Sequence, residues 1–452
     1  MTLPRQKIKA RTPMRIITLS FAAVILLGTL LLGLPVSSRS GVATPFLDCL
    51  FTATSATCVT GLIVYDTYTY WSPFGQAVIL LLIQIGGLGL VTFTTFFNIM
   101  LGKKLGLRSM HLAQESISSM SSDVRQLVGM VVKTALAVEA AGAILFACAF
   151  VPAYGAEGIF VSIFTAISAF CNAGFDLFGR HAPFSSLCSY NWDVFVLGVT
   201  GMLILTGGIG FIVIHDLLQR KTTGKLTLHT RVVLCVTCVL MISGLLVTAL
   251  FEWNNPATLG TMSIPGKIGA SWFHSVSCRT AGFNCFDMAA MYPRTKLASC
   301  IFMFIGAAPG STGGGIKLTT VAVIVMTVIS VIRGQEDTVI FRRKVDKGAV
   351  YKSLAVMVLA LTGILITAAC IVSSLRETGA VSAVDALFES VSAFATVGLT
   401  VGVTGVAGPM ARLLLIFCMY LGRLGPVTFF LSLAYRTSSR REVLPDGKIV
   451  IG

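Results

Sequence analysis

The chain has 452 residues, of which 55% are hydrophobic and 12% are charged. This composition is typical of integral membrane proteins and excludes an ordinary soluble globular protein, because no polar block is long enough to build a soluble domain. The net charge of +15 comes from basic residues in short loops between apolar runs, which excludes nucleic-acid binding and indicates a multi-pass membrane protein in contact with lipid.

Eight apolar runs follow one another along the chain, and each is long enough to cross the hydrocarbon core, which takes about 20 helical residues. They lie at 14–34, 76–101, 126–152, 192–219, 230–251, 297–332, 350–373 and 408–436. Between the members of successive pairs lie half-polar segments at 45–60, 157–173, 266–281 and 382–397. These are too short to span, so we expect re-entrant helices. The predicted fold class is an all-α integral membrane protein with eight transmembrane helices.

Basic residues predict the orientation of the chain. Most of the 34 Lys and Arg residues lie in the N-terminal segment 1–13 and just beyond it, in alternate loops, and in the C-terminal tail 437–452. Because such residues favour the cytoplasmic side, we expect both termini in the cytoplasm. The expected location is the plasma membrane (cell inner membrane). The 12 cysteines are scattered, and we interpret them as buried reduced thiols. The Cys235-x-x-Cys238 pair has no His or Cys partner nearby to suggest a metal site.

The four short segments repeat one another when they are aligned on a glycine. "FTATSATCVTGL", "FTAISAFCNAGF", "WFHSVSCRTAGF" and "FESVSAFATVGL" place Gly61, Gly174, Gly282 and Gly398 at one position, with an aromatic residue ten places earlier. The first, second and fourth segments share an aligned serine, and the third has its serine one place later. The spacing predicts four parallel units of helix, re-entrant pore helix and helix (M1-P-M2) around one central pore. The predicted units are 14–101, 126–219, 230–332 and 350–436.

A glycine after a half-length helix predicts a cation pathway. The carbonyl groups beyond the helix have no helical partners, and lipid would penalise them unless they met an ion. Four such strands around an axis make rings of oxygen atoms, and the C-terminal helix dipoles favour a cation. The alternative is a glycine that only packs helices closely, which does not explain four identical placements. The expected potassium filter consists of Val59, Thr60, Gly61, Asn172, Ala173, Gly174, Thr280, Ala281, Gly282, Thr396, Val397 and Gly398.

The helices after the predicted filter share the glycine motifs "QIGGLG", "TGGIG" and "LGRLG", whereas the third unit reads "GAAPGSTGGGIKLTT" at 306–320. Pro309 and three successive glycines should break the helix there. Non-helical backbone at membrane depth must be buried in protein or line water, so we expect a movable gating loop below the filter. The gate residues are predicted to be Gly310, Gly313, Gly314, Gly315, Lys317 and Arg423.

Other interpretations of these residues remain open. The loop could be a simple helix kink. It also nearly matches the phosphate-binding motif G-x-x-x-x-G-K-[ST], but it follows an apolar helix instead of a strand, which argues against phosphate binding. Arg423, deep in the last apolar run, is expected to face the pore, and the alternative is a structural arginine bonded to helix ends. Acidic residues near the re-entrant helices could concentrate cations or could simply cap helices: Asp48, Glu157, Asp385 and Glu389.

The four filter motifs and the glycine motifs resemble the Trk/Ktr/HKT superfamily of potassium transporters, most closely KtrB-type pore subunits, over about residues 14–436. The resemblance implies K+ as the transported ion, with Na+ as a coupling or activating ion. It also implies a pore-subunit homodimer on a ring of cytosolic, nucleotide-binding RCK-type subunits. In that family, glycine at all four filter positions accompanies potassium selectivity, and Asn172 and Arg279 depart from a strict potassium-channel sequence.

Two rival classes of protein predict other features. A secondary transporter for a small solute should show inverted repeats and charged midplane residues, and a structural membrane protein does not account for four filters. The sequence contains no Ser/His/Asp set and no histidines at metal-ligand spacing, so we expect no enzyme activity.

Overall fold

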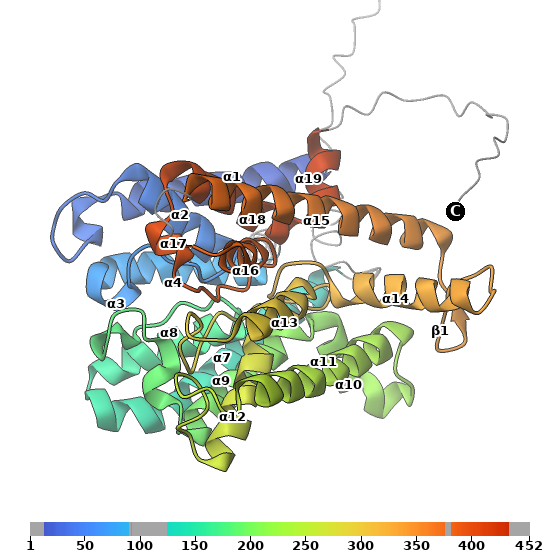
Figure 1. Cartoon of the computed structure of the whole chain (residues 1–452), viewed down its shortest axis with the longest axis horizontal. Helices are drawn as coiled ribbons and strands as arrows, with labels where there is room; N and C mark the ends of the chain where they lie inside the picture. Colours follow the sequence, from blue (N-terminus) through green and yellow to red (C-terminus); the bar gives the residue numbers. More distant parts are fainter. Residues whose placement is uncertain (1–12, 90–91, 93–123, 376–380, 434–452) are drawn as a thin grey trace, which may run out of the picture.

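The computed structural model describes residues 13–89, 92, 124–375 and 381–433. The regular secondary structure of this part of the chain is almost entirely helical (Figure 1), as its apolar composition predicts. The predicted tail 437–452 and nearly all of the predicted N-terminal segment 1–13 lie outside the described residues.

Each predicted unit begins with a long apolar helix. The four long helices are α1 (Pro13–Leu32), α7 (Val124–Tyr154), α11 (Leu228–Glu252) and α15 (Lys347–Ser374). In the described part of the chain these four are long and apolar enough to cross a membrane, and the number rises to six if each of two bent helix pairs is one span. They are also long enough for the hydrocarbon core, which takes about 20 helical residues.

Each long helix is followed by a short one at the predicted re-entrant position. These are α2 (Phe46–Thr57), α8 (Glu157–Phe170), α12 (Ile264–Ser277) and α16 (Ala383–Phe394). The side chains of Ser263 and Ser382 cap the starts of α12 and α16 by accepting backbone N–H bonds, which satisfies donors that a helix start leaves free. Most residues of the four helices are buried, serines and threonines included. These helices therefore belong to the centre of the protein.

A further helix follows each short one: α4 (Pro73–Leu88), α9 (Val194–Gly208), α13 (Pro293–Phe304) and α18 (Pro409–Leu424). Pro73, Pro293 and Pro409 occupy the first turn of α4, α13 and α18, where the missing N–H group costs nothing. After α13 the chain is non-helical until α14 (Leu318–Ile332), as the glycine-rich sequence predicts.

The predicted crossings at 192–219 and 408–436 each contain a sharp bend, which was not predicted from the sequence. The helix α9 meets α10 (Phe211–Thr223) at 93°, and α18 meets α19 (Pro426–Leu433) at 97°. The residues at the bends, Gly210 and Gly425, have φ values of +91° and +84°, and Gly89 ends α4 with a φ of +81°. Only glycine adopts this conformation at little cost. The last glycine of each shared motif therefore ends a helix.

The remaining described elements are short and lie between the helices. They are α3 (Thr67–Tyr70), α17 (Val403–Val406), the 3-10 turns Pro35–Ser37, Phe178–Arg180 and Ser186–Tyr190, and a hairpin of β1 (Val339–Ile340) and β2 (Arg343–Lys344). The hairpin strands are antiparallel, with Val339 opposite Lys344.

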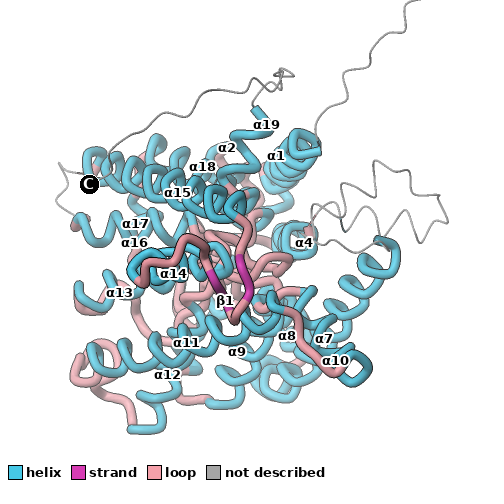
Figure 2. The backbone as a smooth tube through the Cα atoms, turned by 90° about the vertical axis from the view of Figure 1, so that its right-hand side faces the viewer, coloured by secondary structure: helices cyan, strands magenta, loops and turns pink. Residues whose placement is uncertain are grey.

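The four groups of helices contact one another in cyclic order. The helix α4 packs on α7 and α8, α9 packs on α12, α13 packs on α16, and α18 packs on α2. Figure 1 accordingly shows the first helices of the chain beside the last ones. When the protein is viewed along its long axis, helices surround a central region of loops (Figure 2). The order of contacts therefore brings the ends of the four short helices toward one centre.

Candidate functional site: a ring of glycines and the loop beneath it

The four predicted filter glycines form a closed ring, which we call the glycine ring (Gly61, Gly174, Gly282 and Gly398). A Cβ atom added to Gly61 would lie closer than 3.0 Å to the carbonyl oxygen of Ala173, and the same close approach joins Gly174 to Ala281. It continues from Gly282 to Val397 and from Gly398 back to Thr60. Each glycine therefore abuts the carbonyl that precedes the next glycine, and a larger residue would strain the backbone and displace that carbonyl.

The backbone before each glycine adopts a rare conformation. The residues two places earlier, Val59, Asn172, Thr280 and Thr396, have φ values of 58°, 60°, 64° and 51°. A positive φ is uncommon outside glycine and is unusual for β-branched residues, and such strain costs about 1–3 kcal/mol per residue. The same strained conformation at four equivalent places indicates that the surrounding structure imposes one backbone path on all four segments.

One hydrogen bond recurs in all four segments and shows how the third is aligned. The backbone N–H groups of Thr60, Ala173, Ala281 and Val397 donate to the carbonyl oxygens of Ser55, Ser168, Ser277 and Ser392. Ser277 therefore plays the role of the other serines although it lies one residue closer to its glycine. Its hydroxyl donates to the carbonyl oxygen of Phe283, as that of Ser168 does to Phe175. The end of α12 absorbs the difference in spacing.

The other predicted filter residues surround the glycine ring and are fully buried: Val59, Thr60, Asn172, Ala173, Thr280, Ala281, Thr396 and Val397. Within the described chain, the hydroxyl oxygens of Thr60 and Thr396 have no hydrogen-bond partner. Buried hydroxyls are usually hydrogen-bonded. These two oxygens are therefore available to coordinate a cation, because alkali and alkaline-earth cations prefer oxygen ligands.

The acidic residues near the short helices are mostly engaged in ion pairs. Asp48 pairs with Arg412 at 2.5 Å, Glu157 with Arg180 at 2.8 Å and Asp385 with Lys296 at 2.7 Å. Their charges are thereby offset, which favours a structural role over the predicted concentration of cations. Glu389 is fully buried and binds the segment after Gly398 instead. Its carboxylate accepts hydrogen bonds from the hydroxyls of Thr400 and Thr404 and from the Thr404 backbone N–H.

Two further acidic residues, Asp66 and Glu139, were not singled out from the sequence. Asp66, five residues after Gly61, accepts backbone N–H bonds from Tyr68 and Phe184 and so joins the loops that follow the first two ring segments. Glu139 of α7 is buried and accepts from the Gln84 side chain of α4 at 3.0 and 3.1 Å. An acid within an apolar run was the available signal for Glu139. Asp66 gave no signal, because its partner lies in a distant loop.

The glycine-rich loop, residues 305–317, lies directly against the ring segments. The N–H groups of Ala308, Thr312 and Gly315 donate to the carbonyl oxygens of Gly208, Gly207 and Gly422, at the ends of α9 and α18. The Thr312 hydroxyl contacts the Phe170 carbonyl at 3.1 Å and the Asn172 side-chain oxygen at 3.2 Å. The loop thus satisfies helix-end carbonyls that would otherwise be unpaired.

The three successive glycines of this loop face the strained residues of the ring. A Cβ atom on Gly313 or Gly314 would collide with the hydroxyl of Thr280 or Thr396, and one on Gly315 would lie 2.9 Å from the Ala395 carbonyl. Gly315 also has a φ of +69°. Glycine is required here because the loop backbone and the ring segments are in direct contact. Gly310 lies next to α10 and accepts a bond from the Phe211 N–H.

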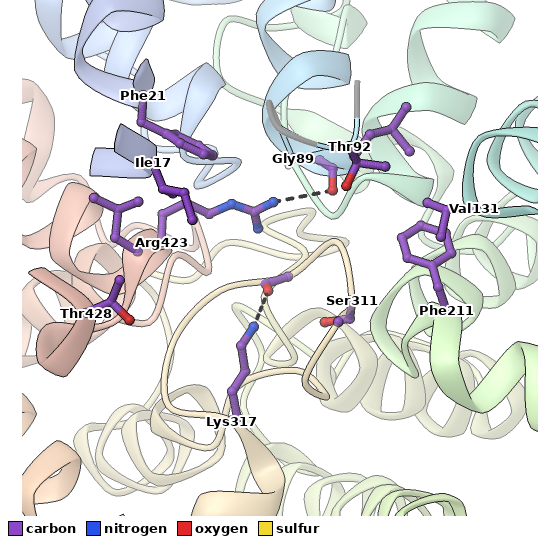
Figure 3. A pocket seen from close by; sticks show the side chains of 15 residues that line it. Ile17, Phe21, Gly89, Thr92, Val131, Phe211, Ser311, Lys317, Arg423 and Thr428 are labelled. Atoms are coloured by element: carbon purple, nitrogen blue, oxygen red, sulfur yellow. Dashed lines mark hydrogen bonds between the residues drawn. The ribbon is translucent and has the colours of Figure 1, made fainter. Parts of the chain in front are cut away.

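Arg423 and Lys317, the two predicted gate cations, both donate hydrogen bonds to backbone carbonyls of the loop, Arg423 from α18 and Lys317 from within the loop itself. The Arg423 guanidinium donates to the carbonyl oxygens of Thr312 and Gly86 and, at 3.3 Å, of Gly87. The Lys317 ammonium donates to the Gly313 carbonyl at 2.7 Å. Figure 3 shows both side chains at a cavity of about 210 Å³. The cavity is also lined by Ile17, Phe21, Thr92, Val131, Phe211, Ser311 and Thr428.

The apolar helices and the ring of backbone carbonyls define a helical membrane protein of the ion-transport class. The chain belongs to the TrkH family, because the sequence profile of that family, described as a cation transport protein, matches residues 2–441. The family resemblance inferred from the motifs is therefore confirmed. The prediction that the chain is not an enzyme is confirmed as well, because its relatives are ion transporters.

Curated relatives match over the whole chain. Ktr system potassium uptake protein B of Bacillus subtilis (strain 168) is 39% identical, and the match covers 100% of both chains. Potassium/sodium uptake protein NtpJ of Enterococcus hirae is 36% identical, again over 100% of both. The crystal structure of the potassium transporter TrkH from Vibrio parahaemolyticus has a TM-score of 0.72 at 16% identity, covering 96% of this chain and 87% of its own. This last likeness shows a shared fold.

Proposed function

We propose that the protein carries K+ into the cell through a pore whose selectivity filter is the glycine ring. The proposed architecture is four parallel M1-P-M2 repeats (14–101, 126–219, 230–332 and 350–436) with eight membrane crossings, in the plasma membrane and with both termini cytoplasmic. The two bent helix pairs then count as one crossing each. Potassium is the proposed ion because full-length relatives carry names of potassium uptake proteins.

The closed glycine ring is the observation that carries the proposal. Each ring glycine contacts the carbonyl of the neighbouring segment, which gathers one backbone carbonyl from each of the four segments around the ring. Such oxygens can replace the hydration shell of a monovalent cation. The C-terminal ends of α2, α8, α12 and α16 precede the ring, and their dipoles favour a positive ion there. The unpaired hydroxyls of Thr60 and Thr396 are further oxygen ligands.

The glycine-rich loop is the proposed gate. It packs against Thr280 and Thr396 of the ring segments, which obstructs a path below the ring. Arg423 holds it through the Thr312 carbonyl and adds a positive charge on the path, which opposes cation passage. Opening then requires the loop to leave its bonds at Gly207, Gly208 and Gly422.

The proposed assembly is a homodimer of this chain on a ring of cytosolic RCK-type nucleotide-binding subunits. Na+ is the proposed coupling or activating ion, in keeping with a relative whose name describes potassium and sodium uptake. Both proposals follow the family relationship and are tested separately from the filter.

Rubidium uptake into proteoliposomes containing the purified protein tests the filter. We expect K+ to compete with ⁸⁶Rb+ more effectively than Na+ does. Replacing any ring glycine with serine should reduce that preference by about tenfold, the effect of roughly 1.4 kcal/mol of lost binding. The matched control is Gly269→Ala in α12, where an added Cβ meets nothing within 4 Å. Equal competition by K+ and Na+ in the wild type, or an unchanged preference in all four serine variants, contradicts the proposal.

A further inference from the structure

The third segment of the ring differs from the other three at one position. Three residues before the ring glycine, the first, second and fourth segments have Cys58, Cys171 and Ala395. All three side chains are small, uncharged and buried. The third segment has Arg279 at this position. A long cationic side chain therefore occupies one of four otherwise equivalent sites behind the glycine ring.

Arg279 is buried without a neutralising partner. Its side chain is 5% exposed, and its Nη2 atom makes a single long bond of 3.5 Å to the Thr237 hydroxyl of α11. The Nη1 atom has no hydrogen-bond partner in the described part of the chain. In that part of the chain, no carboxylate oxygen lies within 4.0 Å of the Arg279 guanidinium, the distance that defines an ion pair. By contrast, the buried Lys296 and the partly buried Arg412 each pair with an aspartate.

The position of Arg279 gives its charge two effects. The residue lies two places after Ser277, the last residue of α12, and a cation near a helix C-terminus is stabilised by the helix dipole and in turn offsets it. An arginine retains its charge in proteins. Inside a protein this charge is poorly screened, so it also acts on other charges at a distance of several ångströms. The third segment therefore attracts a cation in the ring less than its three neighbours do.

We propose that Arg279 is an affinity-determining residue, whose fixed charge weakens cation binding on one side of the glycine ring. The proposal rests on the proposed transport function. Weaker binding has a functional advantage, because an ion that is bound too tightly leaves a filter slowly. Arg279 touches no transported ion and acts through the electric field at the ring.

Three substitutions separate charge from shape. Arg279→Gln removes the charge and keeps much of the side-chain length, Arg279→Ala copies the residue of the fourth segment, and Arg279→Lys keeps the charge. We expect the KM for ⁸⁶Rb+ uptake in proteoliposomes to fall by about tenfold in the Gln and Ala variants, the scale of one charge in a partly desolvated interior. The Lys variant should stay within about twofold of the wild type.

Binding to the purified protein provides a second readout for variants with low flux. The Rb+ concentration that half-maximally raises the thermal unfolding midpoint should be lower for Arg279→Gln than for Arg279→Lys. A KM and a half-maximal concentration that do not change in the Gln and Ala variants overturn the proposal. An equal shift in the Lys variant also overturns it, because shape would then be the cause. Failure of the proposed function itself would appear differently, as wild-type protein without Rb+ uptake.

Discussion

Glu389 shows how one buried acid holds the backbone beside the ring. Its carboxylate accepts hydrogen bonds from Thr400, Val401 and Thr404, which lie just after Gly398. Among the described residues no cation pairs with it. The aligned aromatic residue Phe388 precedes it and is fully buried. The segment beyond the fourth glycine is thus fixed by side-chain acceptors on the helix that leads into it.

We expect Glu389→Gln to lower stability, because the amide turns a donor toward groups that are themselves donors. Leaving buried donors unsatisfied costs about 1–3 kcal/mol. The measurement is the thermal unfolding midpoint of the purified protein in detergent. The control is Glu157→Gln, whose carboxylate is 43% exposed and pairs with Arg180, and an exposed pair contributes about 0–1 kcal/mol. Equal changes in the two variants would refute the assigned role of Glu389.

The sequence predicts the ring glycines well and their surroundings poorly. Gly61, Gly174, Gly282 and Gly398 recur with aligned neighbours, so a repeat reveals them. The positive φ at Val59 and Thr396 contradicts the local preference of β-branched residues, and only the packed structure imposes it. The serine of the third segment looks displaced in an alignment, yet its hydrogen bonds restore the equivalence.

At the scale of elements, the glycine-rich loop and the helix bends illustrate two degrees of predictability. The break after α13 follows from Pro309 and three glycines, which together have very poor helix propensity. The bends at Gly210 and Gly425 were missed, because single glycines are common inside membrane helices and usually serve close packing. The first glycines of the same motifs do pack closely, since Gly86, Gly207 and Gly422 abut the helix-end carbonyls of α2, α8 and α16.

Arg423→Gln should increase ⁸⁶Rb+ flux through the proposed gate. The substitution removes charge-assisted bonds to the carbonyls of Thr312 and Gly86, and such bonds contribute about 1.5–3 kcal/mol each. Losing one should raise the population of the open loop by about tenfold. The initial rate of uptake into proteoliposomes measures the effect, and Arg343→Gln in the exposed hairpin is the charge control. Unchanged or slower flux in protein that elutes as folded would contradict the gate.

At the scale of the whole molecule, one ion pair joins the beginning of the chain to its end. Arg412 of α18 contacts Asp48 of α2 at 2.5 Å, and Tyr65 donates to the same carboxylate at 2.8 Å. The Tyr420 hydroxyl adds a bond to the Thr18 carbonyl of α1. The sequence predicts that the first and fourth units are neighbours, since four parallel units close around an axis. It does not predict which residues meet there.

A double-mutant cycle on Asp48 and Arg412 should measure the coupling energy of this ion pair between the first and fourth units. The side chains of Arg412 and Asp48 are 18% and 8% exposed. Removing one partner of a buried pair costs up to about 3–5 kcal/mol, so Asp48→Asn and Arg412→Met should each lower the unfolding midpoint markedly. The double variant should lose less than the sum, because it leaves no unpaired charge. The control is Lys344→Met, whose pair with Asp337 is 60% and 34% exposed. Strictly additive losses would show that the two residues act independently.

The four glycines close on one another although one polypeptide supplies them all. In an assembly of four identical subunits, any mutation would alter all four segments of such a ring at once. Here each segment is encoded separately, so one segment can change in size, charge or backbone shape while the other three segments stay the same. A difference in electrostatic potential between one side of the glycine ring and the other is therefore a property that a single point mutation can introduce or remove.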